Sequence, residues 1–149
     1  MNAIVKEQIQ IRRIDTPVGV AAAYPLMRQL RPHLADAGEL VTRWERQIGD
    51  GYHMVGLWDG DRLAALAGYR ISENLVYGLH CYVDDLVTDA DARSGGYGHR
   101  LMDWLKAETA AVGCKRLVLD TPLTNVLGHR FYYRNGLLAS ALRFNYMID

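Results

Sequence analysis

Two hydrophobic periods follow one another in the first third of the chain and predict a strand and then two helices. Residues 8–14, QIQIRRI, alternate polar and apolar side chains, which is typical of a strand with one buried face. From 20 to 34 the apolar side chains recur at intervals of three and four, which predicts a helix, although two prolines within it leave its ends open. A second, shorter helix is predicted within 38–51, where two glycines end it.

The middle of the chain has the pattern of a hairpin followed by a further strand. Residues 52–71 contain two strand-like runs separated by the turn residues 59–61, Asp-Gly-Asp. The segment 79–88, LHCYVDDLVT, is the next predicted strand. Side chains alternate between the two faces of a strand, so Asp84 and Asp85 are expected on opposite faces.

The last third repeats a helix and a strand twice. The pattern predicts a helix over 98–113, a strand over 114–121, a helix over 125–136 and a last strand within 137–148. This order predicts an α+β (mixed α/β) fold, with helices packed on a sheet. Since no linker, repeat or low-complexity tract divides the chain, residues 1–149 are expected to form a single domain.

Composition and charge exclude several classes of function. The 149 residues are 50% hydrophobic and 23% charged, with 17 basic and 17 acidic side chains, which is ordinary for a globular protein. A net charge near zero argues against nucleic-acid and membrane-surface partners. The two cysteines lack the spacing of a disulfide framework or a zinc site, so reduced thiols and no metal are expected. The N-terminus resembles neither a signal peptide nor a membrane anchor, and a cytoplasmic location is the default expectation.

A glycine-dense turn, RSGGYG at 93–98, separates the predicted strand 79–88 from the helix that follows it. The first amides of a helix have no partner within the helix and carry partial positive charge, so this junction suits a phosphate or pyrophosphate. Glycine lets the backbone approach such an anion closely, and Arg93 adds a charged donor. The two common phosphate loops, GxxxxGK[ST] and GxGxxG, are absent. Taken alone, the turn fits a tight turn with a solvated arginine equally well.

Two motifs in register make the pattern more specific. Residues 93–98 fit R/Q-x-x-G-x-G/A, the pyrophosphate loop of the GNAT superfamily of N-acetyltransferases, which the chain resembles. Downstream, 125–137 is similar to the family segment N-x-x-A-x-x-F-Y-x-x-x-G-F, with Gly128 and Leu137 in place of alanine and phenylalanine. The resemblance implies a GNAT-like central sheet, mixed but mostly antiparallel, with helices on both faces and a splayed fourth and fifth strand.

The resemblance also implies acetyl-CoA as the acyl donor and a set of residues that bind it. The splay would leave the strand edge at Leu86, Val87 and Thr88 unpaired, free to hydrogen-bond the pantetheine arm. Asn125 would hydrogen-bond the cofactor, although asparagine there also suits the N-cap of the helix. The implied cofactor-binding set is Leu86, Val87, Thr88, Arg93, Ser94, Gly95, Gly96, Tyr97, Gly98 and Asn125.

For catalysis, the resemblance places the general acid at Tyr132 and the general base at Asp84. A phenol with a pKa of about 10 can protonate a departing thiolate, whereas the alternative role for Tyr132 is aromatic packing. Position 84 is an aspartate where many family members have glutamate. The side chain is one methylene shorter, so proton transfer through a water molecule becomes more favourable than direct transfer. Asp84 fits equally well as a carboxylate held by backbone donors or a nearby arginine. His80 and His129 remain alternative bases.

The leading hypothesis is an acetyl-CoA-dependent N-acetyltransferase that acylates an amine directly, with no covalent enzyme intermediate. The acceptor would be an amine of a small molecule, an amino acid or a peptide. The alternative is a non-catalytic acyl-CoA-binding or regulatory module of the same fold. Some polar and aromatic side chains of the first half could line the acceptor pocket: Tyr24, Arg31, His33, Trp44, Tyr52 and Tyr69. The resemblance also raises the possibility of a homodimer.

Overall fold

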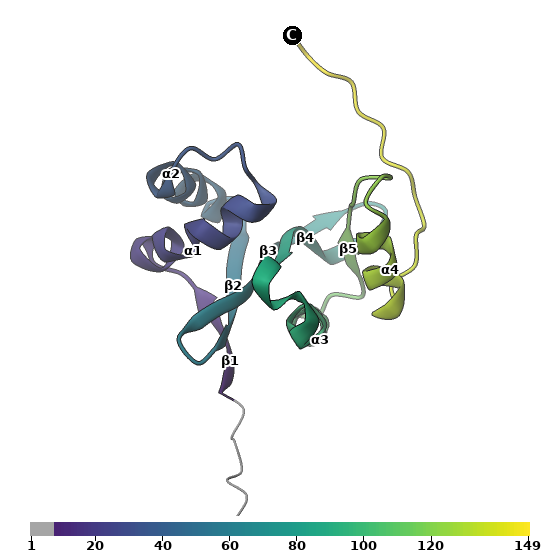
Figure 1. Ribbon diagram of the computed structural model, residues 1–149. Helices are drawn as coiled ribbons and strands as arrows, with labels where there is room; N and C mark the ends of the chain where they lie inside the picture. The colour runs from purple at the N-terminus through teal and green to yellow at the C-terminus, as the bar shows by residue number, and fades with distance from the viewer. Residues whose placement is uncertain (1–7) are drawn as a thin grey trace, which may run out of the picture. The chain divides into compact units, whose positions relative to one another are not determined.

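The computed structural model describes residues 8–149, in two compact units that divide after Val118. The N-terminal unit contains β1 (Ile9–Ile14), α1 (Pro17–Leu30), α2 (Ala37–Ile48), β2 (Tyr52–Asp59), β3 (Arg62–Asn74), β4 (Gly78–Thr88), the 3-10 helix η1 (Ala90–Gly95), α3 (Tyr97–Ala111) and the start of β5 (Leu117–Leu119) (Figure 1). The C-terminal unit contains α4 (Val126–Arg134). The single-domain expectation for 1–149 stays a prediction.

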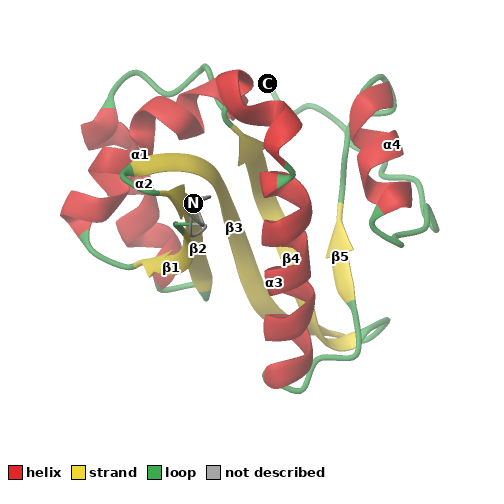
Figure 2. Cartoon of the chain, turned by 60° about the horizontal axis from the view of Figure 1, so that its bottom comes forward, coloured by secondary structure: helices red, strands yellow, loops and turns green. Residues whose placement is uncertain are grey.

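The sheet has the strand order β1-β2-β3-β4-β5 (Figure 2). The pairs β1-β2, β2-β3 and β3-β4 are antiparallel, whereas β5 follows β4 through the helix α3 and runs parallel to it. A helical crossover is the usual way to join parallel strands. The predicted α+β fold with a mixed, mostly antiparallel sheet is therefore confirmed.

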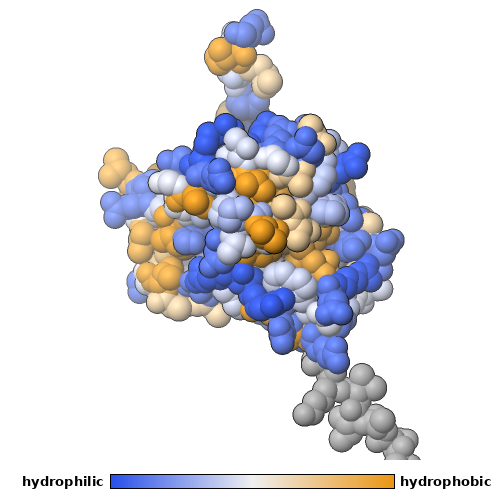
Figure 3. Space-filling model, turned by 90° about the vertical axis from the view of Figure 1, so that its left-hand side faces the viewer, coloured by the Kyte–Doolittle hydropathy of each residue, from blue (hydrophilic) through white to orange (hydrophobic). Residues whose placement is uncertain are grey.

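Helices cover both faces of this sheet. On one face, α1 and α2 pack against Tyr52, Leu66 and Val87, which are each less than 10% exposed. On the other face, the ring of Tyr69 meets Trp104 of α3 edge-on, with ring centroids 6.0 Å apart. Seen from the side of α1 and α2, the surface is mostly polar with scattered apolar side chains, because the apolar stripes of these helices face inward (Figure 3).

Local signals explain where the first two helices begin. The Thr16 side chain accepts a hydrogen bond from the Gly19 amide at 3.0 Å and caps α1. Asp36 caps α2 in the same way through the Glu39 amide at 2.8 Å. Each cap satisfies one of the amides that a helix start leaves without a partner. Helix α1 continues through Pro25, so this proline did not limit the helix.

The predicted last strand within 137–148 is wrong, since residues 137–149 form no helix or strand. Within the C-terminal unit the apolar side chains of this segment after Leu137 are exposed, for example Phe144 at 88% and Ile148 at 84%. An alternating pattern becomes a strand only beside a neighbour that accepts its hydrogen bonds, and the pattern itself does not reveal whether that neighbour is present.

The predicted strand over 114–121 is shortened to Leu117–Leu119. The reason lies at the end of α3, where Gly113 has a φ of +85° and the Cys114 amide donates to the Thr109 carbonyl at 3.0 Å. This bond makes Cys114 part of the helix C-terminus, so it is not available to the strand.

Cys81 and Cys114 are buried free thiols. Within residues 8–149, no group of three His, Cys, Asp or Glu side chains is arranged to hold a metal ion. No helix in that range is both long and apolar enough to cross a membrane. The first seven residues, part of the segment judged to be neither a signal peptide nor an anchor, lie outside the described residues.

Candidate active site

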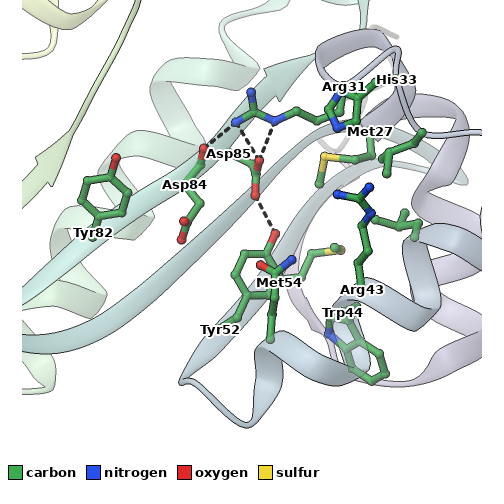
Figure 4. A pocket seen from close by; sticks show the side chains of 13 residues that line it. Met27, Arg31, His33, Arg43, Trp44, Tyr52, Met54, Tyr82, Asp84 and Asp85 are labelled. Atoms are coloured by element: carbon green, nitrogen blue, oxygen red, sulfur yellow. Dashed lines mark hydrogen bonds and ion pairs between the residues drawn. The ribbon is translucent and has the colours of Figure 1, made fainter. Parts of the chain in front are cut away.

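A cavity of about 360 Å³ opens in the N-terminal unit, between β4 and the helices α1 and α2 (Figure 4). Its size is at the lower end of the range of small-molecule sites. The strands β2 and β4 and the two helices all contribute to its walls. The lining residues are Met27, Arg31, His33, Leu34, Leu40, Arg43, Trp44, Gln47, Tyr52, Met54, Tyr82, Asp84 and Asp85.

Asp84 and Asp85 both line this cavity, so the expectation that they face opposite sides of the sheet is wrong. The reason is a β-bulge: Gly68 pairs with Asp85 and Tyr69 pairs with Val83, so Asp84 is an extra residue without a partner on β3. A bulge breaks the alternation of the strand. Both carboxylates therefore point toward the same space.

The carboxylate of Asp85 is fully engaged by two neighbours. Arg31 donates from Nε to Oδ1 at 3.0 Å, and the Tyr52 hydroxyl donates to Oδ2 at 2.8 Å. Arg31 also donates from Nη2 to the backbone carbonyl of Asp84 at 2.8 Å, which fixes the bulge from the side of α1. Asp85 is therefore a structural anchor of the cavity wall.

The carboxylate of Asp84 is engaged on one side only. Arg70 donates from Nε to Oδ2 at 3.1 Å and is itself held by Gln47, whose Oε1 accepts from Arg70 Nη2 at 2.7 Å. Among residues 8–149, none donates a hydrogen bond to Oδ1 of Asp84. Partial burial raises the pKa of the Asp84 carboxyl, an effect that Arg70 opposes. Desolvation and a vacant oxygen are the properties that a proton acceptor needs.

The position of Tyr52 depends on a glycine in the neighbouring strand. The phenol crosses β3 at Gly68 to reach Asp85, and a Cβ at Gly68 would lie 1.8 Å from the Tyr52 hydroxyl oxygen. Burial, and then the charge of Asp85, raise the pKa of the Tyr52 phenol well above its usual value. The phenol therefore remains a hydrogen-bond donor to Asp85.

We expect Gly68→Ala to displace Tyr52 and to break its hydrogen bond to Asp85. Tyr52 is only 6% exposed, so its ring has little room to move, and such overpacking costs about 1–3 kcal/mol. Thermal unfolding should show a Tm lower by several degrees, and the KM for the acceptor should rise. Gly49→Ala is the matched control, because Gly49 has an ordinary helical conformation and an added Cβ there meets only one atom, at 3.4 Å. Equal Tm values for both variants would contradict this account.

The predicted phosphate loop forms the start of α3. Arg93, Ser94 and Gly95 lie in η1, Gly96 is the N-cap of α3, and its residues Tyr97 and Gly98 begin the first turn. No side chain caps this helix start. The first amides of the 15-residue helix are thus available to an anion.

Gly96 has a conformation that favours glycine. Its φ is +74°, in the left-handed region, and a Cβ built there would meet no atom within 4 Å. The backbone at this point therefore borders open space. A ligand can approach it closely only because no side chain is present.

Side chains from other elements hold the loop in place. The Tyr97 hydroxyl donates to Asp59 Oδ2 at 2.6 Å, which ties the helix start to the β2-β3 turn. Asp89, just before η1, pairs with Arg62 at 3.2 Å and accepts a hydrogen bond from Gln29 of α1 at 3.3 Å. These contacts are exposed, so each contributes little stability, but together they fix the path of the loop.

The C-terminal end of β4 lies between the cavity and this loop. Leu86, Val87 and Thr88 pair with β3 on one side. On the other side β5 has three residues against the eleven of β4, and the Cys81 amide donates to the Arg116 carbonyl at 3.0 Å. Strand β5 therefore accompanies the first part of β4 and leaves the part from Leu86 onward without its pairing.

The C-terminal unit contains the other predicted site residues. Asn125 is the N-cap of α4, because its Oδ1 accepts a hydrogen bond from the Gly128 amide at 3.2 Å. Tyr132 lies in the second turn of α4, next to Phe131, and burial raises the pKa of its phenol. Gly136 has a φ of +83° and ends the helix as predicted.

The two alternative bases have other contacts. His80 is 6% exposed, does not line the cavity, and its Nδ1 lies 2.9 Å from the Gly78 carbonyl oxygen. His129, in the C-terminal unit, has Nε2 2.9 Å from the Pro122 carbonyl oxygen. Both rings are thus engaged by backbone.

Four of the six candidate pocket residues do line the cavity: Arg31, His33, Trp44 and Tyr52. Tyr24 instead donates to the Leu34 carbonyl, and Tyr69 lies on the α3 face of the sheet. Sequence reasoning missed Arg43, which lines the cavity, and Arg70, which holds Asp84. The partner of Asp84 depends on the register between β3 and β4, which no local sequence pattern revealed.

Known proteins share sequence with this chain over most of its length. The model of a family described as "Acetyltransferase (GNAT) family" matches residues 20–137. The uncharacterized N-acetyltransferase YhdJ of Bacillus subtilis (strain 168) is 30% identical over 125 residues, which is 83% of this chain and 87% of that protein.

Solved structures share the fold at low sequence identity. The aminoglycoside N-acetyltransferase AAC(6')-Iy in complex with CoA is 15% identical and has a TM-score of 0.85 over 99% of each chain. Glucosamine-6-phosphate N-acetyltransferase from Arabidopsis thaliana is 20% identical, with a TM-score of 0.73 over 96% of this chain and 100% of that one. The chain therefore belongs to the GNAT family, and it is an N-acetyltransferase of a family that uses acyl-CoA as the donor.

Proposed function

We propose that this protein transfers the acetyl group of acetyl-CoA directly to an amine that binds in the cavity beside β4. The observation that carries this proposal is the vacant Oδ1 of Asp84 in that cavity. The same strand continues through Leu86, Val87 and Thr88 to the glycine-rich start of α3. One continuous segment thus supplies a base, a strand edge for the pantetheine arm and an anion site for the pyrophosphate.

The proposed reaction has three steps: deprotonation of the acceptor, attack on the thioester and protonation of the leaving thiolate. Asp84, directly or through a water molecule, takes a proton from the acceptor ammonium, which yields a neutral amine. The amine nitrogen attacks the thioester carbonyl, and the C–N bond forms as the C–S bond breaks. The departing CoA thiolate takes a proton from the Tyr132 hydroxyl. The nitrogen loses its second proton as the amide forms, and this proton replaces, through solvent, the one that Tyr132 gave up. Asp84 releases its proton to solvent, so the products are an N-acetylated amine, CoA and one proton.

Tyr132 suits the role of the acid. Burial raises the pKa of its phenol above the usual value of about 10, so it is protonated at neutral pH. The Asn125 side chain caps α4 through Oδ1, and its Nδ2 donates to Thr121 Oγ1 at 2.9 Å. Asn125 is proposed to contact the cofactor through the second hydrogen of Nδ2.

The cysteines do not suit an acyl-enzyme intermediate, and this supports direct transfer. Burial raises the pKa of the Cys81 thiol to about 11, and burial also raises the pKa of Cys114. Only the thiolate is an effective nucleophile, and at neutral pH both groups remain thiols.

The proposed acceptor is a primary amine of a small molecule, an amino acid or a peptide. A volume of about 360 Å³ admits a small molecule or the end of a chain. Two of the structural neighbours carry small amine acceptors in their names, glucosamine 6-phosphate and an aminoglycoside. These names support the class of acceptor, a small amine, and neither compound is proposed as the acceptor of this chain.

The test measures thiol release from acetyl-CoA with a panel of amines, amino acids and short peptides. We expect acceptor-dependent release with at least one class, and mass spectrometry should find one acetyl group added to the acceptor. Asp84→Asn should lower kcat/KM by about 10- to 1,000-fold. Tight binding of CoA without turnover on any acceptor would instead support the non-catalytic acyl-CoA-binding module.

A further inference from the structure

The charges around the cavity are balanced in pairs. Arg31 lies 2.9 Å from Asp85, and Arg70 lies 3.1 Å from Asp84. The third guanidinium, that of Arg43, is paired with Glu39 at 2.9 Å. A cavity without excess negative charge does not favour the binding of a polycation. Each additional ammonium group would lie near a guanidinium group and be repelled by it.

The two carboxylates and Arg43 lie on different walls of the cavity. Figure 4 shows Asp84 and Asp85 on the β4 side of the cavity and Arg43 on the opposite side, where α2 lies. Arg43 uses Nε and Nη2 for Glu39. Among the residues from 8 to 149, none accepts a hydrogen bond from its Nη1. His33 lies on the same side of the cavity.

The space between these two walls is lined by apolar side chains together with the polar side chains of Gln47 and Tyr52. The apolar part of the lining consists of five hydrophobic side chains, each at most 7% exposed: Met27, Leu34, Leu40, Trp44 and Met54. An apolar part of a ligand would gain from burial against these five side chains.

From this arrangement we infer that the acceptor is a small amino carboxylic acid with an apolar body. Its amino group lies at Oδ1 of Asp84, its carboxylate accepts from Nη1 of Arg43, and its apolar part contacts the methionine and leucine side chains between them. This inference rests on the proposed function of the same cavity and narrows its acceptor class. Arg43 is then a specificity-determining residue, because its contact raises kcat/KM only for acceptors that carry a carboxylate.

The test compares matched acceptors that differ in the carboxylate alone, with acetyl-CoA as the donor. The pairs are 5-aminopentanoate with butylamine and 6-aminohexanoate with pentylamine, in which an apolar chain separates the amino group from the carboxylate. Spermidine and glucosamine 6-phosphate represent polycations and polar phosphates. We expect kcat/KM for each amino acid to exceed that of its amine by about 10- to 100-fold, the range of one charged hydrogen bond. Most of the difference should lie in KM.

The variant Arg43→Gln should reduce this ratio toward one. Arg46→Gln is the matched control, since Arg46 is an exposed arginine of the same helix that does not line the cavity, and it should keep the wild-type ratio. A ratio of one or less in the wild-type protein, or a higher kcat/KM for spermidine or glucosamine 6-phosphate, would overturn the inference and leave the proposed function intact. No transfer to any amine or amino acid, with CoA bound, would overturn both.

Discussion

Replacement of Gly96 by valine is expected to abolish the binding of CoA. Valine brings a branched Cβ into the space that borders the first amides of α3, where the glycine now leaves no atom within 4 Å. An anion cannot then reach these amides, and the Kd measured by calorimetry should rise by about 100-fold or more. The φ of +74° adds backbone strain of roughly 1–2 kcal/mol, so the variant should also unfold at a lower temperature.

A control separates strain from blocked access. Gly78 also has a positive φ, +65°, and open space around a Cβ, but it lies at the far end of β4 from the loop. Gly78→Val should lose similar stability and still bind CoA. Gly96→Asn is the complementary variant, because asparagine tolerates the left-handed conformation and yet places a side chain in the same space. If folded Gly96 variants bind CoA as the wild type does, the phosphates are held elsewhere.

Replacement of Tyr132 by phenylalanine is expected to lower kcat by about 10- to 100-fold, in the lower part of the range for general acid catalysis. The variant keeps the ring and loses the hydroxyl that protonates the thiolate. The Kd for CoA should stay nearly unchanged. Pre-steady-state measurement of CoA release, under conditions where chemistry limits the rate, is the measurement that reports on this step.

Tyr133→Phe is the matched control for this variant. Tyr133 is adjacent in the sequence, is 56% exposed and points about 100° away around the helix, so the loss of its hydroxyl should leave kcat unchanged. An unaltered kcat in Tyr132→Phe, with chemistry shown to limit the rate, would mean that solvent or another group protonates the thiolate.

The parts of the fold that depend on local sequence were predictable. The hairpin at 59–61, the strand that contains Asp84 and the helix that begins after Gly96 all appear where the hydrophobic periods and glycines place them. Their signals act over a few neighbouring residues, through backbone conformation and burial of one face. The two family motifs could be recognised for the same reason, since each is a short continuous segment of the sequence.

The features that the sequence did not reveal depend on pairing between distant segments. Whether Asp84 and Asp85 share a face is decided by one unpaired residue in the register of β3 and β4. The Arg70 contact and the passage of Tyr52 over Gly68 follow from the same register. Likewise, the apolar pattern after Gly136 resembles a strand, but a strand also requires a partner, and no local pattern encodes one.

The bulge in β4 changes which face of the sheet the side chains before and after Asp84 occupy. Cys81 and Val83 face α3, whereas Asp85 and Val87, which have the same parity in the sequence, face α1 and α2. Removal of the single residue 84 would restore regular alternation and leave all four of these side chains on their present faces. The alternation of β4 on either side of the bulge therefore does not depend on Asp84. The proposed catalytic carboxylate is carried by the one residue that lies outside this alternation.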